Sequence, residues 1–220
     1  MHNLIAALTL ETFSVAKPPD TGNHQKAWIA QSESNPTETP RIGTYASPGP
    51  LDQESNTYWV ETADGVVVIE AQWVLPEAQN AIEAIRASTD SPLAAIFITH
   101  PHSDHFGGIN AFVETAENNL PIYACYLTLT SIRNDSEGFI SQRQEAFGDD
   151  FSNPVTLPNQ IVEDGDEIEF GEVNFRILEF PHNESLTMTM PYLPEQGVLF
   201  SGDLVGNQRT PVLREGLTAL

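Results

Sequence analysis

The amino-acid sequence predicts an α/β fold in which mixed β-sheets carry helices on their outer faces. Between residues 57 and 150, apolar runs typical of strands alternate with stretches of helical periodicity. From residue 166 onward, short strand-like runs separated by turn residues predominate. With 220 residues the chain is long enough to bury one substantial core, so we expect one main domain.

The first half of this domain alternates strands and helices. Residues 63–65, Ala-Asp-Gly, join the first two strands as a hairpin turn. Pro76 opens the first helix, in which Ile82 and Ile85 fall on one face. Residues 93–99 read LAAIFIT, an apolar run as in a strand buried on both faces. We therefore expect, in chain order, strands over 57–62 and 65–72, a helix over 76–89, a strand over 93–99, a helix over 109–116, a strand over 121–125, and helix and loop from about 127 to 150.

The second half of the domain consists mostly of strands. Gly171 and Glu172 mark a second hairpin turn, and residues 194–196, Pro-Glu-Gln, mark another turn. The strands expected around these turns cover residues 166–170, 173–180, 186–193 and 197–203.

The N-terminal quarter of the chain lacks such a pattern. Residues 31–56 are rich in Ser, Thr, Pro, Gly and Asn, with few large apolar side chains. We interpret residues 1–56 as an irregular segment or linker and assign residues 57–220 to the main domain.

The charge of the chain argues against polyanionic partners. Acidic residues outnumber Lys and Arg by 31 to 9, which gives a net charge of −22. Such a surface repels phosphate backbones and anionic headgroups, so we expect a small-molecule substrate and neither nucleic acid nor a membrane as partner. No apolar stretch reaches the ~18 residues that a membrane span needs. We expect a soluble protein, with cytoplasmic and exported locations both open, because the early run LIAALTL has no preceding Lys or Arg.

Cys125 is the single cysteine of the chain, so no internal disulfide can form. It lies in the apolar run PIYACYL, which favours a buried small side chain over a reactive thiol.

A dense cluster of imidazoles follows the strand expected over residues 93–99. The chain reads THPHSDHFGG, so three histidines and one aspartate fall between His100 and His105. His100 and His102 are two positions apart, and in an extended backbone both rings can project to one side and share a metal ion. Asp104 and His105 follow in another direction, which suits a second ion. The glycines at 107–108 give the backbone freedom to turn behind these ligands.

Two further candidate ligands also follow strand ends. His182 follows the strand expected over residues 173–180 after one intervening proline, and Asp203 ends the run GVLFSGD. Ligands in α/β proteins collect at the carboxyl ends of strands, so both residues are candidates for the same site. His2 and His24 lie in the unpatterned N-terminal segment, and we expect no metal-binding role for them.

Together, THPHSDH, a downstream histidine and GVLFSGD resemble the metallo-β-lactamase superfamily. The resemblance runs from about Thr57 to the C-terminus, and TYWVETADGVVVIEAQ is similar to the first hairpin of the family. It implies an αββα sandwich of two mixed β-sheets, with metal ions at one edge. It also implies two metal sites with these ligands: His100, His102 and His182 for one ion, Asp104 and His105 for a second, and Asp203 as the bridge.

The chain departs from the family pattern at three points. Glu70 stands where most members end the strand with aspartate, which affects support of the loop. His182 follows a proline, whereas the family histidine usually follows a glycine. No histidine follows Asp203, although the family usually supplies one. We expect either a C-terminally truncated domain or an incomplete second site, with one ion held tightly and the second weakly or not at all.

The resemblance implies a metal-dependent hydrolase acting on an ester, thioester, lactone, amide or phosphoester. The cofactor expected is one or two zinc ions, with iron or manganese as alternatives. Asp104 could also accept a proton from the attacking water, which makes it the candidate catalytic residue. Two alternatives stay open: a non-haem iron redox enzyme, since two histidines and a carboxylate suit iron as well, and a degenerate scaffold that binds metal without catalysis.

Overall fold

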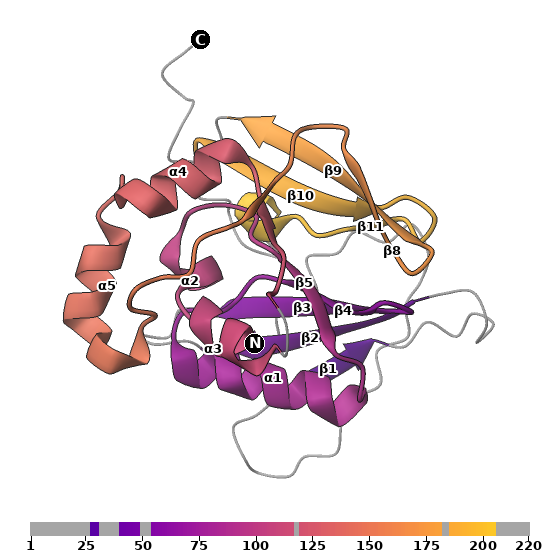
Figure 1. The fold of residues 1–220 in the computed structure, drawn as a ribbon, viewed down its shortest axis with the longest axis horizontal. Coiled ribbons are helices and arrows are strands. Elements are labelled where there is room, and N and C mark those ends of the chain that lie inside the picture. The colour runs from indigo at the N-terminus through magenta and orange to yellow at the C-terminus, as the bar shows by residue number, and fades with distance from the viewer. Residues whose placement is uncertain (1–26, 31–39, 49–53, 117–118, 182–184, 206–220) are drawn as a thin grey trace.

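The computed structural model describes residues 27–30, 40–48, 54–116, 119–181 and 185–205. Within these residues, two β-sheets lie face to face, and helices cover the outer face of the larger sheet (Figure 1). None of the described helices is long and apolar enough to cross a membrane.

The larger sheet has seven strands that lie in the order of the chain. These are β1 (Ala27–Ala30), β2 (Arg41–Ser47), β3 (Ser55–Thr62), β4 (Gly65–Ile69), β5 (Leu93–Phe97), β6 (Ile122–Ala124) and β7 (Gln160–Ile161). Neighbours from β1 to β4 are antiparallel, whereas β4, β5, β6 and β7 run parallel. The carboxyl ends of β4 and β5 therefore meet at one edge of the sheet.

The smaller sheet is antiparallel throughout its described strands. Its order is β11-β10-β9-β8, with β8 (Glu167–Phe170), β9 (Val173–Pro181), β10 (Thr187–Leu193) and β11 (Val198–Leu199). The expected α/β sandwich of two sheets is confirmed. The expectation that both sheets are mixed is wrong for the smaller one, whose described strands follow one another through short connections and are all antiparallel.

The helices occupy the crossovers between the parallel strands. They are α1 (Leu75–Ser88) between β4 and β5, α2 (Ser103–Phe106) and α3 (Ile109–Thr115) between β5 and β6, and α4 (Tyr126–Asn134) and α5 (Phe139–Phe147) between β6 and β7. Short 3-10 turns cover Gly148–Asp150 and Gly202–Leu204.

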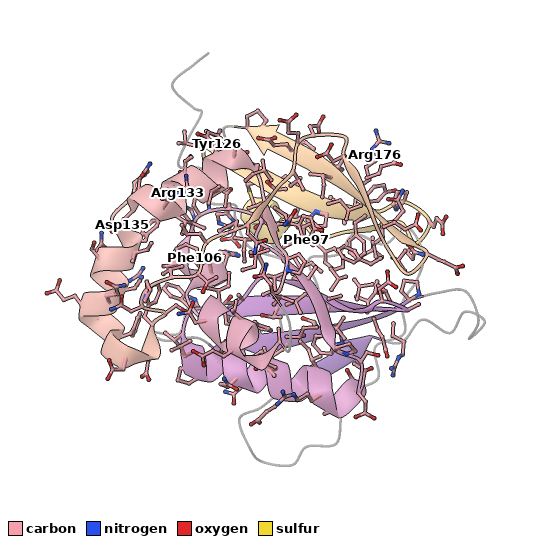
Figure 2. All side chains as sticks on the ribbon, in the orientation of Figure 1. Phe97, Phe106, Tyr126, Arg133, Asp135 and Arg176 are labelled. Carbon is pink, nitrogen blue, oxygen red and sulfur yellow. The ribbon has the colours of Figure 1, made fainter. Side chains whose placement is uncertain are left out.

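Two hydrophobic cores lie on opposite faces of the larger sheet. Alternation along β4 sends Val66 and Val68 to the core shared with the helices, and Val67 and Ile69 to the core between the sheets. Phe97 of β5 lies in the core between the sheets (Figure 2). The helix-facing core continues to α2 and α3, so it reaches directly beneath the histidine cluster.

The observed elements follow the expected order, but β1 and β2 are strands within the segment expected to be irregular, residues 1–56. β2 lies within residues 1–56 and pairs along its whole length with β3, from Arg41↔Glu61 to Ser47↔Ser55. Its middle is buried, and a Cβ on Gly43 would lie 2.1 Å from the ring of Trp59. The expectation of irregular structure is therefore wrong over Ala27–Ala30 and Arg41–Ser47, because pairing between strands outweighs the local composition. The assignment of residues 57–220 to one domain stays a prediction.

Candidate metal centre

The candidate metal centre lies where the carboxyl ends of β4 and β5 meet. Two backbone hydrogen bonds hold the segment after β4 against the segment after β5. The amide of Glu70 donates to the carbonyl of Phe97 (3.0 Å), and that of Ala71 donates to the carbonyl of His105 (2.7 Å). The residues expected to bind metal therefore project from a backbone that is fixed on both sides.

The two glycines behind the histidine cluster serve close packing. Gly107 and Gly108 have φ angles of −60° and −95°, which other residues adopt readily. A Cβ on Gly107, however, would lie 2.0 Å from the carbonyl oxygen of Trp73, and one on Gly108 would lie 2.6 Å from that of Ala71. The expectation that these glycines supply turning freedom is wrong, since the requirement is the approach of residues 71–74.

His100 and His102 direct one ring nitrogen each toward a common point. Nε2 of His100 lies 3.0 Å from Nδ1 of His102, and both rings are buried. Nδ1 of His100 is 2.9 Å from the hydroxyl of Thr99, which leaves Nε2 as its donor atom toward the centre. The pair can therefore hold one ion through Nε2 of His100 and Nδ1 of His102.

The ring of His105 lies beside that of His100, with centroids 4.1 Å apart, and is surrounded by carboxylates. Its Nε2 is 3.2 Å from Oδ2 of Asp104 and 3.5 Å from Oδ1 of Asp203. Asp203 arrives in the 3-10 turn after β11, where Gly202 has φ +50° and its Cα packs tightly against Thr99. A side chain at position 202 would meet the Thr99 hydroxyl at 2.7 Å, so glycine is what allows Asp203 to reach the centre.

Three groups of side chains in the described part of the chain could hold a metal ion, with ligand atoms within 4.8 Å of one another in each group. The groups are His100, His102 and Asp203; Asp104, His105 and Asp203; and Glu70, His100 and His105. Five of the six predicted ligands are thus brought together. His182 lies outside the described residues, and its role stays a prediction.

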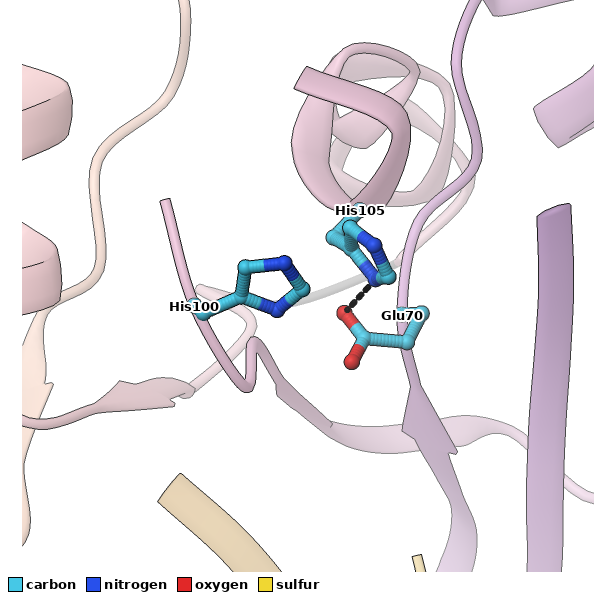
Figure 3. Close-up of side chains that lie close together, drawn as sticks. All are labelled: Glu70, His100 and His105. Atoms are coloured by element: carbon cyan, nitrogen blue, oxygen red, sulfur yellow. Dashed lines mark ion pairs between the residues drawn. The ribbon is translucent and has the colours of Figure 1, made fainter. Parts of the chain in front are cut away.

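Glu70 is the residue that sequence reasoning did not identify as part of the site. Its side chain is 2% exposed, and Oε2 lies 3.3 Å from Nδ1 of His105 (Figure 3). Figure 3 shows its carboxylate pointing from the end of β4 toward that ring. The signal available in the sequence was a carboxylate at the end of an apolar strand, GVVVIE.

Several buried polar atoms of the candidate metal centre make no hydrogen bond within the described part of the protein. Among the described residues, both oxygens of Glu70 and both ring nitrogens of His105 are buried without a hydrogen bond of good geometry. Such atoms cost roughly 1–3 kcal/mol each when left without a partner. Imidazole and carboxylate groups are ligands of zinc and of non-haem iron. The donor set and these atoms therefore fit a bound metal ion.

The pKa values of His105, Asp104 and Asp203 depend strongly on one another. Burial lowers the pKa of His105, but the carboxylates of Asp104, Glu70 and Asp203 outweigh it and hold this pKa well above its ordinary value. Burial raises the pKa of both Asp104 and Asp203, but the His105 imidazolium outweighs it and holds both values below the ordinary range. At neutral pH, His105 therefore carries a proton that a metal ion must displace to bind Nε2.

Comparison with known proteins identifies the class of protein. A family model described as the metallo-beta-lactamase superfamily matches residues 51–219, and the chain belongs to this superfamily. Most members of the superfamily are metal-dependent hydrolases.

Among curated proteins, the Beta-lactamase-like protein 2 homolog of Caenorhabditis elegans is 28% identical over 173 residues, which cover 77% of this chain and 50% of that protein. Ribonuclease J 1 of Streptococcus pyogenes is 30% identical over 108 residues, which cover 44% of this chain and 18% of that protein. The chain thus spans half or less of the length of these relatives.

Among solved structures, metallo-beta-lactamase IND-7 superimposes with a TM-score of 0.62 at 18% identity, covering 94% of this chain and 79% of that chain. At this identity the likeness establishes the fold.

Proposed function

We propose that the protein is a metal-dependent hydrolase that acts on an ester, thioester, lactone, amide or phosphoester. The observation that supports this most strongly is that two groups of potential ligands share Asp203: His100 and His102 on one side, and Asp104 and His105 on the other. Two ions held side by side in this way are a recurring arrangement in hydrolytic enzymes. Zinc is the metal we expect, with iron or manganese as alternatives.

In this proposal, each ligand group has a distinct role. His100 and His102, with His182 as the expected third ligand, hold the first ion, and Asp104 and His105 hold the second. The chemistry that such ions supply when bound is activation of water near neutral pH and polarisation of the substrate oxygen.

Asp104 is the residue best placed to handle a proton in this reaction. Its side chain is 22% exposed, so water can reach it, and its lowered pKa keeps it ionised at neutral pH. It can therefore accept a proton or bind metal, and its backbone carbonyl is held by the hydroxyl of Ser55 at 2.8 Å.

The second ion should be held more weakly than the first. Asp104, His105 and Asp203 offer a single imidazole, and the proton on His105 competes with the ion. We expect hydrolytic activity to rise as zinc is titrated from substoichiometric to excess. Two sites of equal, tight affinity in calorimetry would contradict this part of the proposal.

Elemental analysis of protein purified without added metal tests the proposal directly. We expect bound zinc, with loss of hydrolysis of chromogenic esters, lactones and phosphodiesters on chelation and recovery on adding zinc back. His102→Ala and His182→Ala should lose metal to a similar degree, whereas His24→Ala should retain it. A protein that holds no metal and takes up no zinc would overturn the proposal, and retained iron without hydrolysis would favour the redox alternative.

Phosphodiesters belong in this panel despite the charge of the chain. The expectation that nucleic acid is not a partner rests on the net charge of −22 alone. Because Ribonuclease J 1 is among the relatives, the comparisons do not support excluding nucleic acid. A single-stranded RNA substrate beside a small phosphodiester separates the two possibilities.

A further inference from the structure

Helix α5 contacts the histidine cluster although it has little share in the hydrophobic core. The nine residues Phe139–Phe147 are all described, and none of them is buried. In Figure 1, α4 and α5 form a pair along one side of the molecule. Ile140 and Phe147, which are partly buried, pack against the helix-facing core, and the other contacts of α5 lead toward the histidine cluster.

Phe139 at the start of α5 and Glu137 in the turn before it meet the ring of His102. The ring of Phe139 lies edge-on to the imidazole, with centroids 5.2 Å apart and planes at 88°. Oε2 of Glu137 lies 3.6 Å from the buried Nε2 of His102, which is longer than a hydrogen bond and within ion-pair distance when the imidazole is protonated. Since Nδ1 of the same ring faces Nε2 of His100 at 3.0 Å, Glu137 lies on the side away from the expected ion.

A third contact reaches the next residue of the motif. Nε of Arg143, one helical turn beyond Phe139, donates to the hydroxyl of Ser103 at 3.2 Å. Its guanidinium lies 4.8 Å from the centre of the Trp73 ring, which also packs edge-on against Phe147. Ser103 separates His102 from Asp104, so α5 holds a side chain that lies between two predicted ligands.

The turn that carries Glu137 is itself well defined. Asp135 ends α4 in the left-handed conformation, with φ 47°. Its carboxylate accepts hydrogen bonds from the amides of Ile140 (2.8 Å) and Ser141 (3.0 Å), which caps the start of α5. The pocket between this turn and α2 has room for about one water molecule, about 10 Å³, which is far below the roughly 300–1,000 Å³ of ligand sites. The turn is therefore suited to positioning and not to substrate binding.

We propose that the segment from Glu137 to Arg143 positions the metal-binding motif. Glu137 and Phe139 hold the ring of His102 so that Nδ1 faces the ion, and Arg143 holds Ser103. A carboxylate on the second nitrogen of a metal-binding histidine fixes its tautomer and orientation. The inference rests on the proposed function in one respect, namely that His102 binds a metal ion.

Zinc affinity of the full chain, measured by competition with a chelating dye, tests this role. We expect Glu137→Ala to bind zinc 10- to 100-fold more weakly than the wild type. Glu137→Gln keeps an oxygen that can accept from Nε2–H and should recover part of this loss. Glu145→Ala removes the same charge from an exposed position of α5 and should have no effect.

Two measurements separate positioning from a merely structural role. In ¹⁵N spectra of the imidazoles, zinc should fix the His102 tautomer with the proton on Nε2, and Glu137→Ala should broaden or shift that signal. In the wild type, zinc should slow amide hydrogen exchange in α5 more than in α1, because coupling between two sites is reciprocal.

The outcomes distinguish this inference from the proposed function. The positioning role alone would be overturned if wild type and Glu137→Ala had equal zinc affinity and equal His102 signals. It would also be overturned if zinc gave α5 no added protection from exchange. A wild type that binds no zinc would overturn the proposed function and this inference together.

Discussion

Replacement of Glu70 by glutamine tests how the buried carboxylate beside His105 acts on the metal centre. The change removes a negative charge but keeps an oxygen that can accept from Nδ1, 3.3 Å away in the wild type. Carboxylates that orient metal-binding histidines contribute about 10- to 100-fold in metal affinity, or about 1.4–2.8 kcal/mol. Glu70 lies at Nδ1, whereas Asp104 and Asp203 lie at Nε2. We therefore expect a loss within this range, smaller than that caused by removing a ligand.

The assay compares zinc affinities by competition with a chelating dye. Glu83→Gln makes the same charge change at an exposed position of α1 and serves as the control. Glu70→Asp withdraws the carboxylate by about 1.5 Å, one carbon–carbon bond, and should give an intermediate affinity. Wild-type affinity in Glu70→Gln would refute the reasoning. A loss as severe as that of His100→Ala would instead identify Glu70 as a ligand.

Three further predictions concern the support of the centre. Gly202→Ala should weaken zinc binding at least tenfold, because its Cβ would lie 2.7 Å from the Thr99 hydroxyl. Gly197 has a similar φ of +64°, but a Cβ there would meet nothing within 4 Å. Gly197→Ala should therefore lower the stability by about 1 kcal/mol and leave zinc binding unchanged. The metal-free protein should be most stable between about pH 4 and 6.5 in denaturant titrations. The raised pKa of His105 gives stability that is lost as pH rises through that pKa, and the lowered pKa values of the two aspartates give stability that is lost in acid. Phe97→Ala should reduce the free energy of unfolding in urea by about 3–5 kcal/mol. The ring of Phe97 is buried between the sheets and stacks on the rings of Tyr123 and Phe175. A loss below about 1 kcal/mol would contradict that packing.

The parts of the fold that could be predicted from the sequence are those whose signal is local. Alternation and turn residues mark the hairpin of β3 and β4, and helical spacing of Ile82 and Ile85 marks α1. The clustered ligands from His100 to His105 are adjacent in the chain, so their chemistry is visible without a structure.

The parts that could not be predicted depend on contacts between distant residues. β2 is stabilised by pairing with β3 and by the ring of Trp59 over Gly43, and its own composition resembles a linker. α1 and β5 separate Glu70 from His105 in the chain. Their contact is visible only in the structure, where the ends of β4 and β5 meet. The same holds for Glu137, which reaches His102 from a different crossover.

The charges around the centre set the order in which a cation and an anionic substrate should bind. Glu70, Asp104 and Asp203 place three carboxylates around His105, within a chain of net charge −22. Such a centre attracts cations and repels phosphoesters or carboxylates until bound metal offsets the charge. We therefore expect the KM of an anionic substrate to fall as zinc occupancy rises at constant ionic strength, while the KM of a neutral ester changes little. Steady-state kinetics with a matched pair of substrates, one carrying a carboxylate and one its methyl ester, measures the difference. An equal response of both KM values to zinc would show that the carboxylates act as ligands without governing access of the substrate.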